Sequence, residues 1–267
     1  MLVRSRRLNN EVFVSMILDQ RVSLLAVDEA HCVSEWGPSF RAEYLKVARF
    51  AKEIAAERVL CLTATATPSV VKDVCASENG FDIDVEKGVF STGAYRPNLS
   101  LLIKPASSAK SKINLLVPFL KGLGGSSAII YVTTHQQAED LVAELKTKDI
   151  QDCAYYHAGM KPEDRKAVQD WFIDGEGIVV ATIAFGMGID KANIRAVVHF
   201  NLPKTLENYS YVSLTNGDSL PLPVHKLILI YFDRQEVGRA GRDGLPATCL
   251  LIPAGSDFPI LEGFALV

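Results

Sequence analysis

Two adjacent carboxylates, Asp28 and Glu29, follow directly after the apolar run 23–27. Such a run ending in polar residues is typical of a strand buried in a parallel sheet, and ligands bind at the carboxyl ends of these strands. A carboxylate there can hold Mg²⁺ through water, while its neighbour takes a proton from the water that attacks a phosphate. Two acidic residues alone would more often cap a helix, but the order Asp-Glu-Ala-His after an apolar strand favours phosphoryl transfer. We therefore predict that Asp28 binds the metal and Glu29 is the general base.

Two arginines, Arg239 and Arg242, are three residues apart, so on a helix they point to one face. Guanidinium groups in this arrangement can reach across a cleft to a γ-phosphate as arginine fingers. A solvated helix face is the ordinary alternative, yet Arg-Ala-Gly-Arg-Asp-Gly over 239–244 is too particular a sequence for it. We therefore predict that Arg239 and Arg242 are catalytic residues.

The composition is compatible with several classes of globular protein. The 267 residues are enough for one large or two medium domains, and 48% hydrophobic and 22% charged residues are typical of a globular protein. A net charge of −3 lowers the expectation of DNA binding without excluding it, because a strand-binding channel needs only a local row of donors. No apolar run approaches the roughly 20 residues that would span a bilayer, so no membrane segment is expected.

The five cysteines are scattered, with no Cys-x-x-Cys pair and no histidine at the spacing of metal ligands. The sequence therefore predicts no zinc site. Cys61, Cys153 and Cys249 lie in apolar runs, which indicates buried thiols of a reducing compartment.

Short apolar runs alternate with segments of helical periodicity, which predicts an α/β fold with parallel sheets covered by helices on both faces. The expected strands are 23–27, 58–63, 127–132, 177–182, 196–201 and 248–252, and the expected helices include 41–55, 68–76, 135–148 and 162–173. We expect a first domain over 1–98, a linker over 99–112, a second domain over 113–253, and the start of a further region at 254–267.

The stretch 26–37, followed by Phe40 and Arg41, closely resembles motif II and the aromatic-rich loop of RecQ helicases. In that family the loop senses single-stranded DNA and couples it to ATP hydrolysis. The resemblance implies that Trp36 and Phe40 stack on bases and that Arg41 contacts a phosphate or a base plane. Residues 37–39 favour a loop, which weakens the alternative that the two aromatic residues belong to the core. The family usually has His-Asp where this chain has Pro38-Ser39.

Further segments match the family in its order: 62–66 resembles motif III, 95–99 the entry to the second domain, and 156–160, 181–191 and 235–244 motifs of that domain. The resemblance implies two RecA-like domains, of which the first is incomplete, and an ATP-dependent 3′-to-5′ DNA helicase of DNA repair and recombination. It implies ATP and Mg²⁺ as cofactors and single-stranded or partly duplex DNA as partner. It assigns a catalytic role to Gln235, coupling roles to His31, Thr63, Thr65 and Asp190, and DNA contacts to Thr182 and Gly186.

A phosphate-binding loop of the form GxxxxGK[ST] is absent from the 267 residues. In the family this loop lies upstream of the acidic strand, where about 20 residues are too few for a βαβ unit of roughly 30 or more. We therefore expect a chain shortened at both ends. Without the loop, the triphosphate loses its amide nest and lysine, so we expect no measurable ATPase from this chain alone.

Residues 211–234 interrupt a segment that is continuous in the family. Our hypothesis is a translated intron, whose 24 codons would keep the reading frame, forming a poorly ordered excursion beside the arginine helix. With the family resemblance, an intron points to the nucleus of a eukaryotic cell.

Two alternatives remain open at this stage. A shortened, catalytically inactive chain could act as a DNA-binding or decoy module. An RNA helicase of the DEAD/DEAH group would fit the core motifs but not the loop around Trp36.

Overall fold

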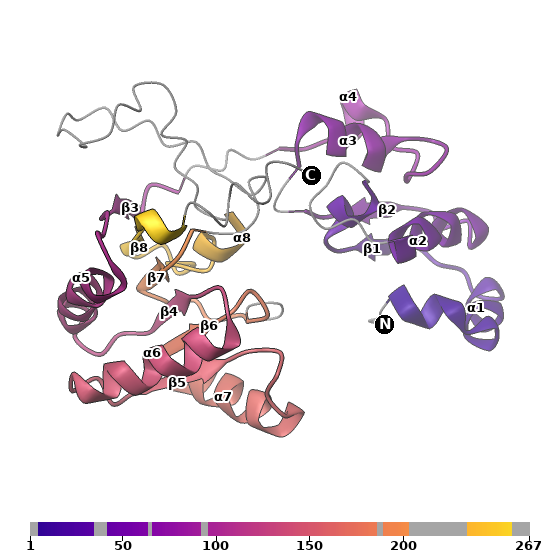
Figure 1. Cartoon of the computed structure of the whole chain (residues 1–267). Helices are drawn as coiled ribbons and strands as arrows, with labels where there is room; N and C mark the ends of the chain where they lie inside the picture. Colours follow the sequence, from indigo (N-terminus) through magenta and orange to yellow (C-terminus); the bar gives the residue numbers. More distant parts are fainter. Residues whose placement is uncertain are drawn as a thin grey trace. The chain divides into compact units, whose positions relative to one another are not determined.

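The computed structural model divides the chain into two compact units, unit 1 (Met1–Ala94) and unit 2 (Tyr95–Val267). It describes residues 5–34, 42–63, 66–91, 96–185, 189–202 and 234–257. Figure 1 shows the elements of both units.

Unit 1 contains one pair of parallel strands among its described residues. Strand β1 (Leu25–Val27) pairs with β2 (Val59–Cys61), and Val27 lies opposite Cys61, so the two strands end together. The helical elements are η1 (Ser5–Asn9), α1 (Glu11–Leu18), η2 (Ala30–Val33), α2 (Ala42–Glu53), α3 (Pro68–Cys75) and α4 (Val85–Gly88).

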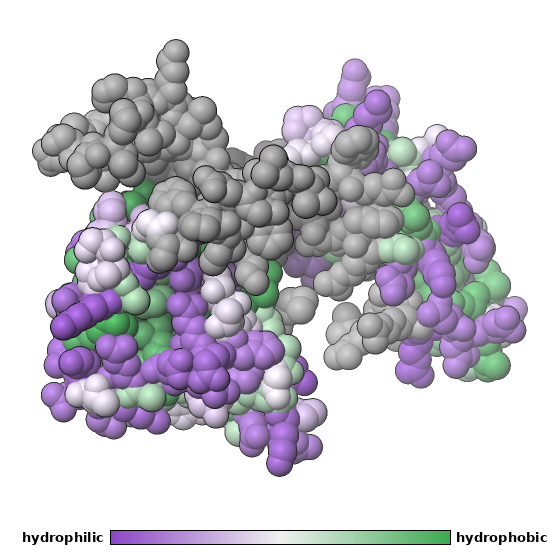
Figure 2. Space-filling view, viewed as in Figure 1, coloured by the Kyte–Doolittle hydropathy of each residue, from purple (hydrophilic) through white to green (hydrophobic). Residues whose placement is uncertain are grey.

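The core of unit 1 covers only one face of this strand pair. Its buried members come mainly from β1, α2 and α3, and include Val27, Ala48 and Val70. The other face is open, because Ala26 and its partner Leu60 are exposed. Helix α1 has no buried residue, and its apolar surface is visible in Figure 2. Among its described residues, unit 1 therefore exposes much apolar surface to water.

Unit 2 is built on a six-stranded sheet in which every pairing is parallel, in the order β3-β8-β7-β4-β6-β5. The strands are β3 (Leu99–Ile103), β4 (Ala128–Tyr131), β5 (Cys153–Tyr156), β6 (Ile178–Ala181), β7 (Ala196–His199) and β8 (Ala247–Leu251). The helical elements are α5 (Ala109–Gly122), α6 (His135–Thr147), α7 (Pro162–Asp174), α8 (Arg234–Val237) and η4 (Gly255–Asp257).

Helices cover both faces of this sheet. One core cluster joins α5 and α6 to the strands through residues such as Leu116 and Leu145. A second cluster, on the other face, includes Phe172 of α7 and Val237 of α8. Every residue of the central strands β4, β6 and β7 is buried, as parallel strands with two covered faces require.

Local signals in the sequence explain where several helices begin. The Thr134 hydroxyl accepts a hydrogen bond from the backbone N–H of Gln137 at 3.2 Å and so caps α6. Thr67 caps α3 in the same way through Val70 N, at 3.3 Å. Pro162 occupies the first turn of α7, where its missing N–H costs nothing.

The predicted α/β class and the parallel sheets are confirmed, and the structure corrects two local expectations. Residues 99–112, expected as a linker, contain β3 and the first residues of α5. Strand β5 was not among the expected strands. Both β3 and β5 are edge strands that are only partly buried, so their apolar signal in the sequence is weak.

Residues 211–233 of the predicted insert lie outside the described residues, and Arg234 is the first residue of α8. None of the helices in the described ranges combines the length and the apolar composition needed to cross a membrane.

Candidate functional site

The two predicted carboxylates lie at the carboxyl end of β1. Asp28 is exposed, and its Oδ1 accepts a hydrogen bond from the backbone N–H of Glu29 at 2.9 Å. Glu29 has φ 50° and ψ 42°, in the left-handed region that a non-glycine residue adopts only at a cost of about 1–3 kcal/mol. Such strain is often found at functional sites. Here it turns the chain sharply between β1 and η2.

The predicted coupling residue His31 joins the ends of both strands of unit 1. Its Nδ1 lies 2.9 Å from Thr63 Oγ1 and 3.3 Å from Glu29 Oε2. The imidazole is buried, with a side chain only 3% exposed. Since Thr63 follows β2 and Glu29 follows β1, the His31 ring contacts both segments. A shift of one segment would therefore be transmitted to the other.

The backbone holds these two strand ends together as well. Leu62 N donates to Val27 O at 2.8 Å, and Ala30 N donates to Leu62 O at 2.9 Å. Ser34 Oγ donates to Asp73 Oδ2 of α3 at 2.5 Å, which fixes the chain just before the predicted aromatic-rich loop.

Several predicted residues lie outside the described residues: Thr65, Trp36, Phe40, Arg41 and Gly186. Gln235 lies in α8.

In unit 2 the structure brings Arg242 and Asp190 together. Arg242 Nη1 lies 3.2 Å from Asp190 Oδ1, and its Nε donates to Gly238 O at 3.4 Å. Arg239 is half-buried, one residue before Ala240, which is fully buried in the sheet core. The two arginines therefore belong to one short segment, residues 238–245, which we call the arginine turn.

Thr182 lies at the carboxyl end of β6, where the resemblance expects a phosphate contact. It is 6% exposed, and its N–H donates to Tyr156 O at 3.2 Å. Its own carbonyl accepts from Phe185 N at 3.0 Å, which turns the chain after the strand.

Comparison with known proteins gives two matches along the chain. Residues 7–74 match the DEAD/DEAH box helicase family, and residues 111–244, half of the chain, match the helicase conserved C-terminal domain. RecS of Bacillus subtilis is 35% identical over 243 residues, and the ATP-dependent DNA helicase RecQ of the same organism is 33% identical over 260 residues. The chain belongs to the RecQ-like helicases.

This RecQ-like chain spans only part of its relatives. The matches cover 90% of the chain but 43% of RecS, and 97% of the chain but 39% of RecQ. ATP-dependent DNA helicase Q5 of Mus musculus is 36% identical over 91% of the chain and 23% of its own length.

Solved structures share the RecA-like helicase fold with the RecQ-like chain. Dbp5 of S. cerevisiae bound to RNA and ADP BeF3 gives a TM-score of 0.65 at 18% identity, over 93% of this chain and 60% of that chain. The helicase Lhr of Mycobacterium smegmatis bound to ssDNA and AMP-PNP gives 0.62, also at 18% identity, over 93% of this chain and 30% of that chain. These likenesses establish the fold.

The acidic segment fits part of the ATP site of a RecQ-like helicase. Asp28 offers exposed carboxylate oxygens, which suit a hydrated Mg²⁺. Glu29 Oε2 is buried beside the His31 ring, 3.3 Å from its Nδ1. Carboxylate oxygens that could hold Mg²⁺ are therefore present, but the sequence has no GxxxxGK[ST] loop to hold the triphosphate.

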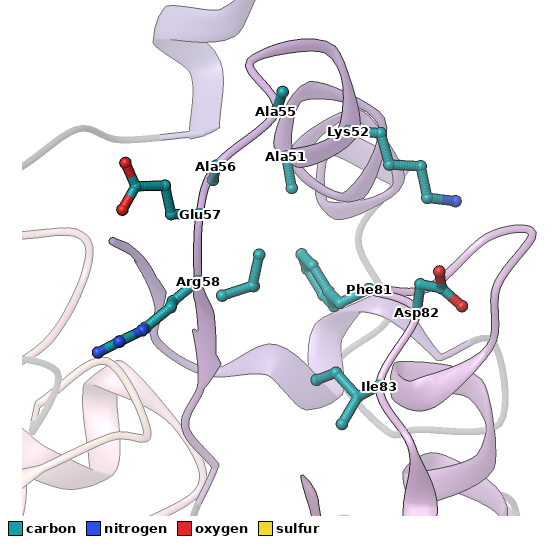
Figure 3. A pocket seen from close by; sticks show the side chains of 10 residues that line it. Ala51, Lys52, Ala55, Ala56, Glu57, Arg58, Phe81, Asp82 and Ile83 are labelled. Carbon is teal, nitrogen blue, oxygen red and sulfur yellow. The ribbon is translucent and has the colours of Figure 1, made fainter. Parts of the chain in front are cut away.

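A surface pocket of about 440 Å³ lies elsewhere in unit 1 (Figure 3). Its lining includes Val59, the first residue of β2, together with Phe81 and Ile83. Because Asp28 follows the last residue of the parallel strand β1, the pocket lies at the opposite end of the strand pair from the acids. The pocket therefore does not include the two predicted carboxylates.

Two ion pairs that no sequence pattern indicated hold the arginine turn. His199 Nε2 lies 2.6 Å from Glu236 Oε2 in the core, which ties α8 to the end of β7. Arg195 Nη2 donates to both carboxylate oxygens of Asp243, at 2.7 and 2.6 Å, and thereby holds the pKa of that carboxyl below its usual value. Asp243 lies within the quoted motif, but its partner is 48 residues away along the chain.

His157 is buried between two exposed rings. It stacks on His135 at 4.4 Å and on Tyr155 at 5.5 Å between ring centroids, and its Nε2 lies 3.0 Å from Glu139 Oε1. A Cβ on Gly159 would lie 3.1 Å and 3.3 Å from the Nδ1 atoms of the two histidines, so this stack requires a glycine there or a shift of the rings.

All five cysteines are free thiols, of which Cys153 and Cys249 are buried and Cys61 is half-buried. Burial raises the pKa of Cys61 and of Cys249 to about 12. These thiols therefore stay protonated at neutral pH.

Proposed function

We propose that the chain forms part of the motor of an ATP-dependent DNA helicase of the RecQ type, with 3′-to-5′ polarity. The proposal is supported above all by the contacts of His31, which joins the acidic segment to the segment after β2. A motor needs such a link, because the state of the nucleotide must be transmitted to the residues that hold DNA. The names of the relatives RecQ and Q5 agree with this activity.

In the proposed reaction, Asp28 would hold Mg²⁺ through water, and Glu29 takes the proton of the attacking water. Bound Mg²⁺ would neutralise charge that develops on the phosphate oxygens. Arg239 and Arg242 stabilise the charge on the transferred phosphoryl group, and Asp190 orients Arg242 through their ion pair. Gln235 belongs to the same catalytic set.

The proposed DNA contacts come from both units. Trp36 and Phe40 stack on bases and Arg41 contacts the strand, while Thr182 and Gly186 approach a phosphate. Single-stranded or partly duplex DNA is the proposed partner, and Thr63 and Thr65 couple it to the acids.

An extended chain would test this activity. We would fuse the phosphate-loop segment of a RecQ-like relative upstream of residue 1 and measure ATP hydrolysis with DNA or RNA of the same sequence. We expect stimulation by DNA, with a loss of about 10²–10⁴-fold for Glu29→Gln and about 10³–10⁵-fold for Arg242→Lys. Stronger stimulation by RNA would favour the RNA-helicase alternative, and DNA binding without turnover would favour a decoy module.

The chain of 267 residues should not turn over ATP by itself. The sequence contains no GxxxxGK[ST] loop whose lysine and amides would hold the β- and γ-phosphates, so we expect no release of labelled phosphate above background. Turnover by the purified chain that disappears in Glu29→Gln would contradict this expectation.

We further propose a role in DNA repair and recombination and a nuclear location. Animal relatives such as Q5 of Mus musculus support the location, although relatives from Bacillus subtilis match at similar identity. Imaging of the tagged protein in its own cells would test it, and a signal excluded from the nucleus would overturn it.

A further inference from the structure

We propose that Arg96 and Asn98 are positioning residues for the arginine turn. This inference rests on the proposed function, in which Arg239 and Arg242 reach the γ-phosphate. Arg96 and Asn98 immediately precede β3, and they lie more than 140 positions from the arginine turn in sequence.

The guanidinium of Arg96 donates to three backbone carbonyls of the arginine turn. Its Nη1 lies 3.2 Å from Gly238 O, and its Nη2 lies 2.9 Å from Ala240 O and 2.6 Å from Gly241 O. These carbonyls flank Arg239 and immediately precede Arg242. A planar guanidinium with five donors in a fixed geometry can hold several carbonyls at once, which an ammonium group does less well.

Asn98 binds the second half of the arginine turn. Its Nδ2 donates to Gly241 O at 2.8 Å and to Leu245 O at 2.9 Å, while its backbone carbonyl accepts from Ala247 N at 2.9 Å. One side chain thus holds a carbonyl on each side of Arg242.

Gly241 shows how tightly the two parts fit. Its φ of +54° lies in the left-handed region, and a Cβ there would lie 2.6 Å from Asn98 Nδ2. Any other residue at 241 would strain the backbone and displace Asn98. Gly241 of the Arg-Ala-Gly-Arg motif therefore leaves room for the Asn98 side chain.

This arrangement gives the arginine turn a fixed backbone where its own secondary structure is short. Helix α8 has only four residues, and three of the carbonyls that follow it are held by Arg96. Catalytic groups need placement within roughly 0.5 Å, so a loosened turn would misplace both arginines while the sheet stayed folded. Arg96 is also the second residue of unit 2, so the chain enters unit 2 through the residues that hold the turn.

The test uses the full 267-residue chain and does not need ATP turnover. Hydrogen exchange would be measured for amides of the arginine turn, together with the NMR signal of the Arg242 Nε–H, in Arg96→Ala, Arg96→Lys and Asn98→Ala. We expect Arg96→Ala to speed exchange in the turn by about tenfold or more, with the amides of β4 and β6 unchanged. Arg96→Lys should keep part of the protection that Arg96→Ala loses. A low concentration of guanidinium added to Arg96→Ala should restore part of that protection.

Lys52→Met is the matched control. Lys52 Nζ donates to Ser77 O and to Glu78 O, so it too is a cation that holds backbone carbonyls, but in unit 1. The control should leave exchange in the arginine turn unchanged. Unchanged exchange and an unchanged Arg242 signal in Arg96→Ala would overturn the proposal. So would an equal loss of protection throughout unit 2. An extended chain that never hydrolyses ATP would refute the proposed function and leave this result standing.

Discussion

The two units use the same kind of sheet and bury it to different extents. In unit 2, the central strands β4, β6 and β7 are buried at every residue, and helices cover both faces. In unit 1, the described strands β1 and β2 have one covered face, and Leu60 is 45% exposed on the other. A two-stranded sheet is marginal in water unless its apolar face is covered.

This difference in burial shows that the geometry of a site does not depend on how large a core its unit has. The acids and the buried imidazole of unit 1 are held by a small core and by hydrogen bonds between two strand ends. The arginine turn of unit 2 is fixed onto a sheet with two full layers of side chains. A site can thus keep its local geometry in a unit that contributes little stability, provided that hydrogen bonds fix the segments that carry it.

The largest expected consequence is a difference in local stability. Amides of β4 and β6 should exchange only through global unfolding of unit 2, whereas amides of β1 and β2 should open with a free energy lower by about 5 kcal/mol. Native-state hydrogen exchange followed by mass spectrometry would measure both. Equal opening free energies in the two pairs of strands would show that the comparison is wrong.

A pair of identical substitutions makes the comparison sharper. Leu116 of α5 is fully buried, so Leu116→Ala should lower the free energy of unfolding of unit 2 by about 3 kcal/mol. Leu60→Ala removes the same atoms from an exposed position of β2 and should cost less than about 1 kcal/mol. Urea unfolding followed by circular dichroism would check both, and a Leu60→Ala effect as large as that of Leu116→Ala would mean that the open face of unit 1 is covered in solution.

The sequence predicted the parts of the fold whose pattern is local. The central strands of unit 2 are continuous apolar runs because both of their faces are buried, and 127–132 and 177–182 were recognised on that basis. The edge strands were missed. In β3, half-buried residues alternate with exposed ones, and a Ser-rich segment follows, so the run looked like a linker.

The candidate site was predictable in its residue types and less so in its contacts. Asp28 and Glu29 were identified by their place after an apolar run, Arg242 by its spacing from Arg239, and Asp190 by the resemblance. Arg96 was part of a recognised motif, but its partners lie up to 145 residues away, and no local pattern indicates which carbonyls a guanidinium will reach. Contacts of this kind depend on the sheet order, which brings β3 next to β8.

A smaller effect should appear at high pH in unit 2. Burial raises the pKa of the Cys249 thiol from 9.0 to about 12, so the folded state holds this proton more tightly than the unfolded state. The resulting stability is fully present below pH 9 and is lost as the pH rises toward 12, by about 2 kcal/mol at pH 10.5. The free energy of unfolding would be measured at pH 8 and pH 10.5 for the chain and for Cys249→Ala. The variant should show the smaller decrease, and identical decreases would contradict the burial of this thiol.

The smallest expected effects come from two threonines with the same role in different units. Thr67 caps α3 in unit 1, and Thr134 caps α6 in unit 2, each through one hydrogen bond to a backbone N–H. Each substitution to alanine should cost about 1 kcal/mol, because one donor of the first helical turn loses its partner. If the units unfold separately, Thr67→Ala shifts only the transition of unit 1, and Thr134→Ala shifts only that of unit 2. Hydrogen exchange of β1 and β4 amides in both variants would separate the two outcomes. A Thr67→Ala variant that lowered the protection of β4 by the full 1 kcal/mol or so would show that the open sheet of unit 1 and the covered sheet of unit 2 unfold as one.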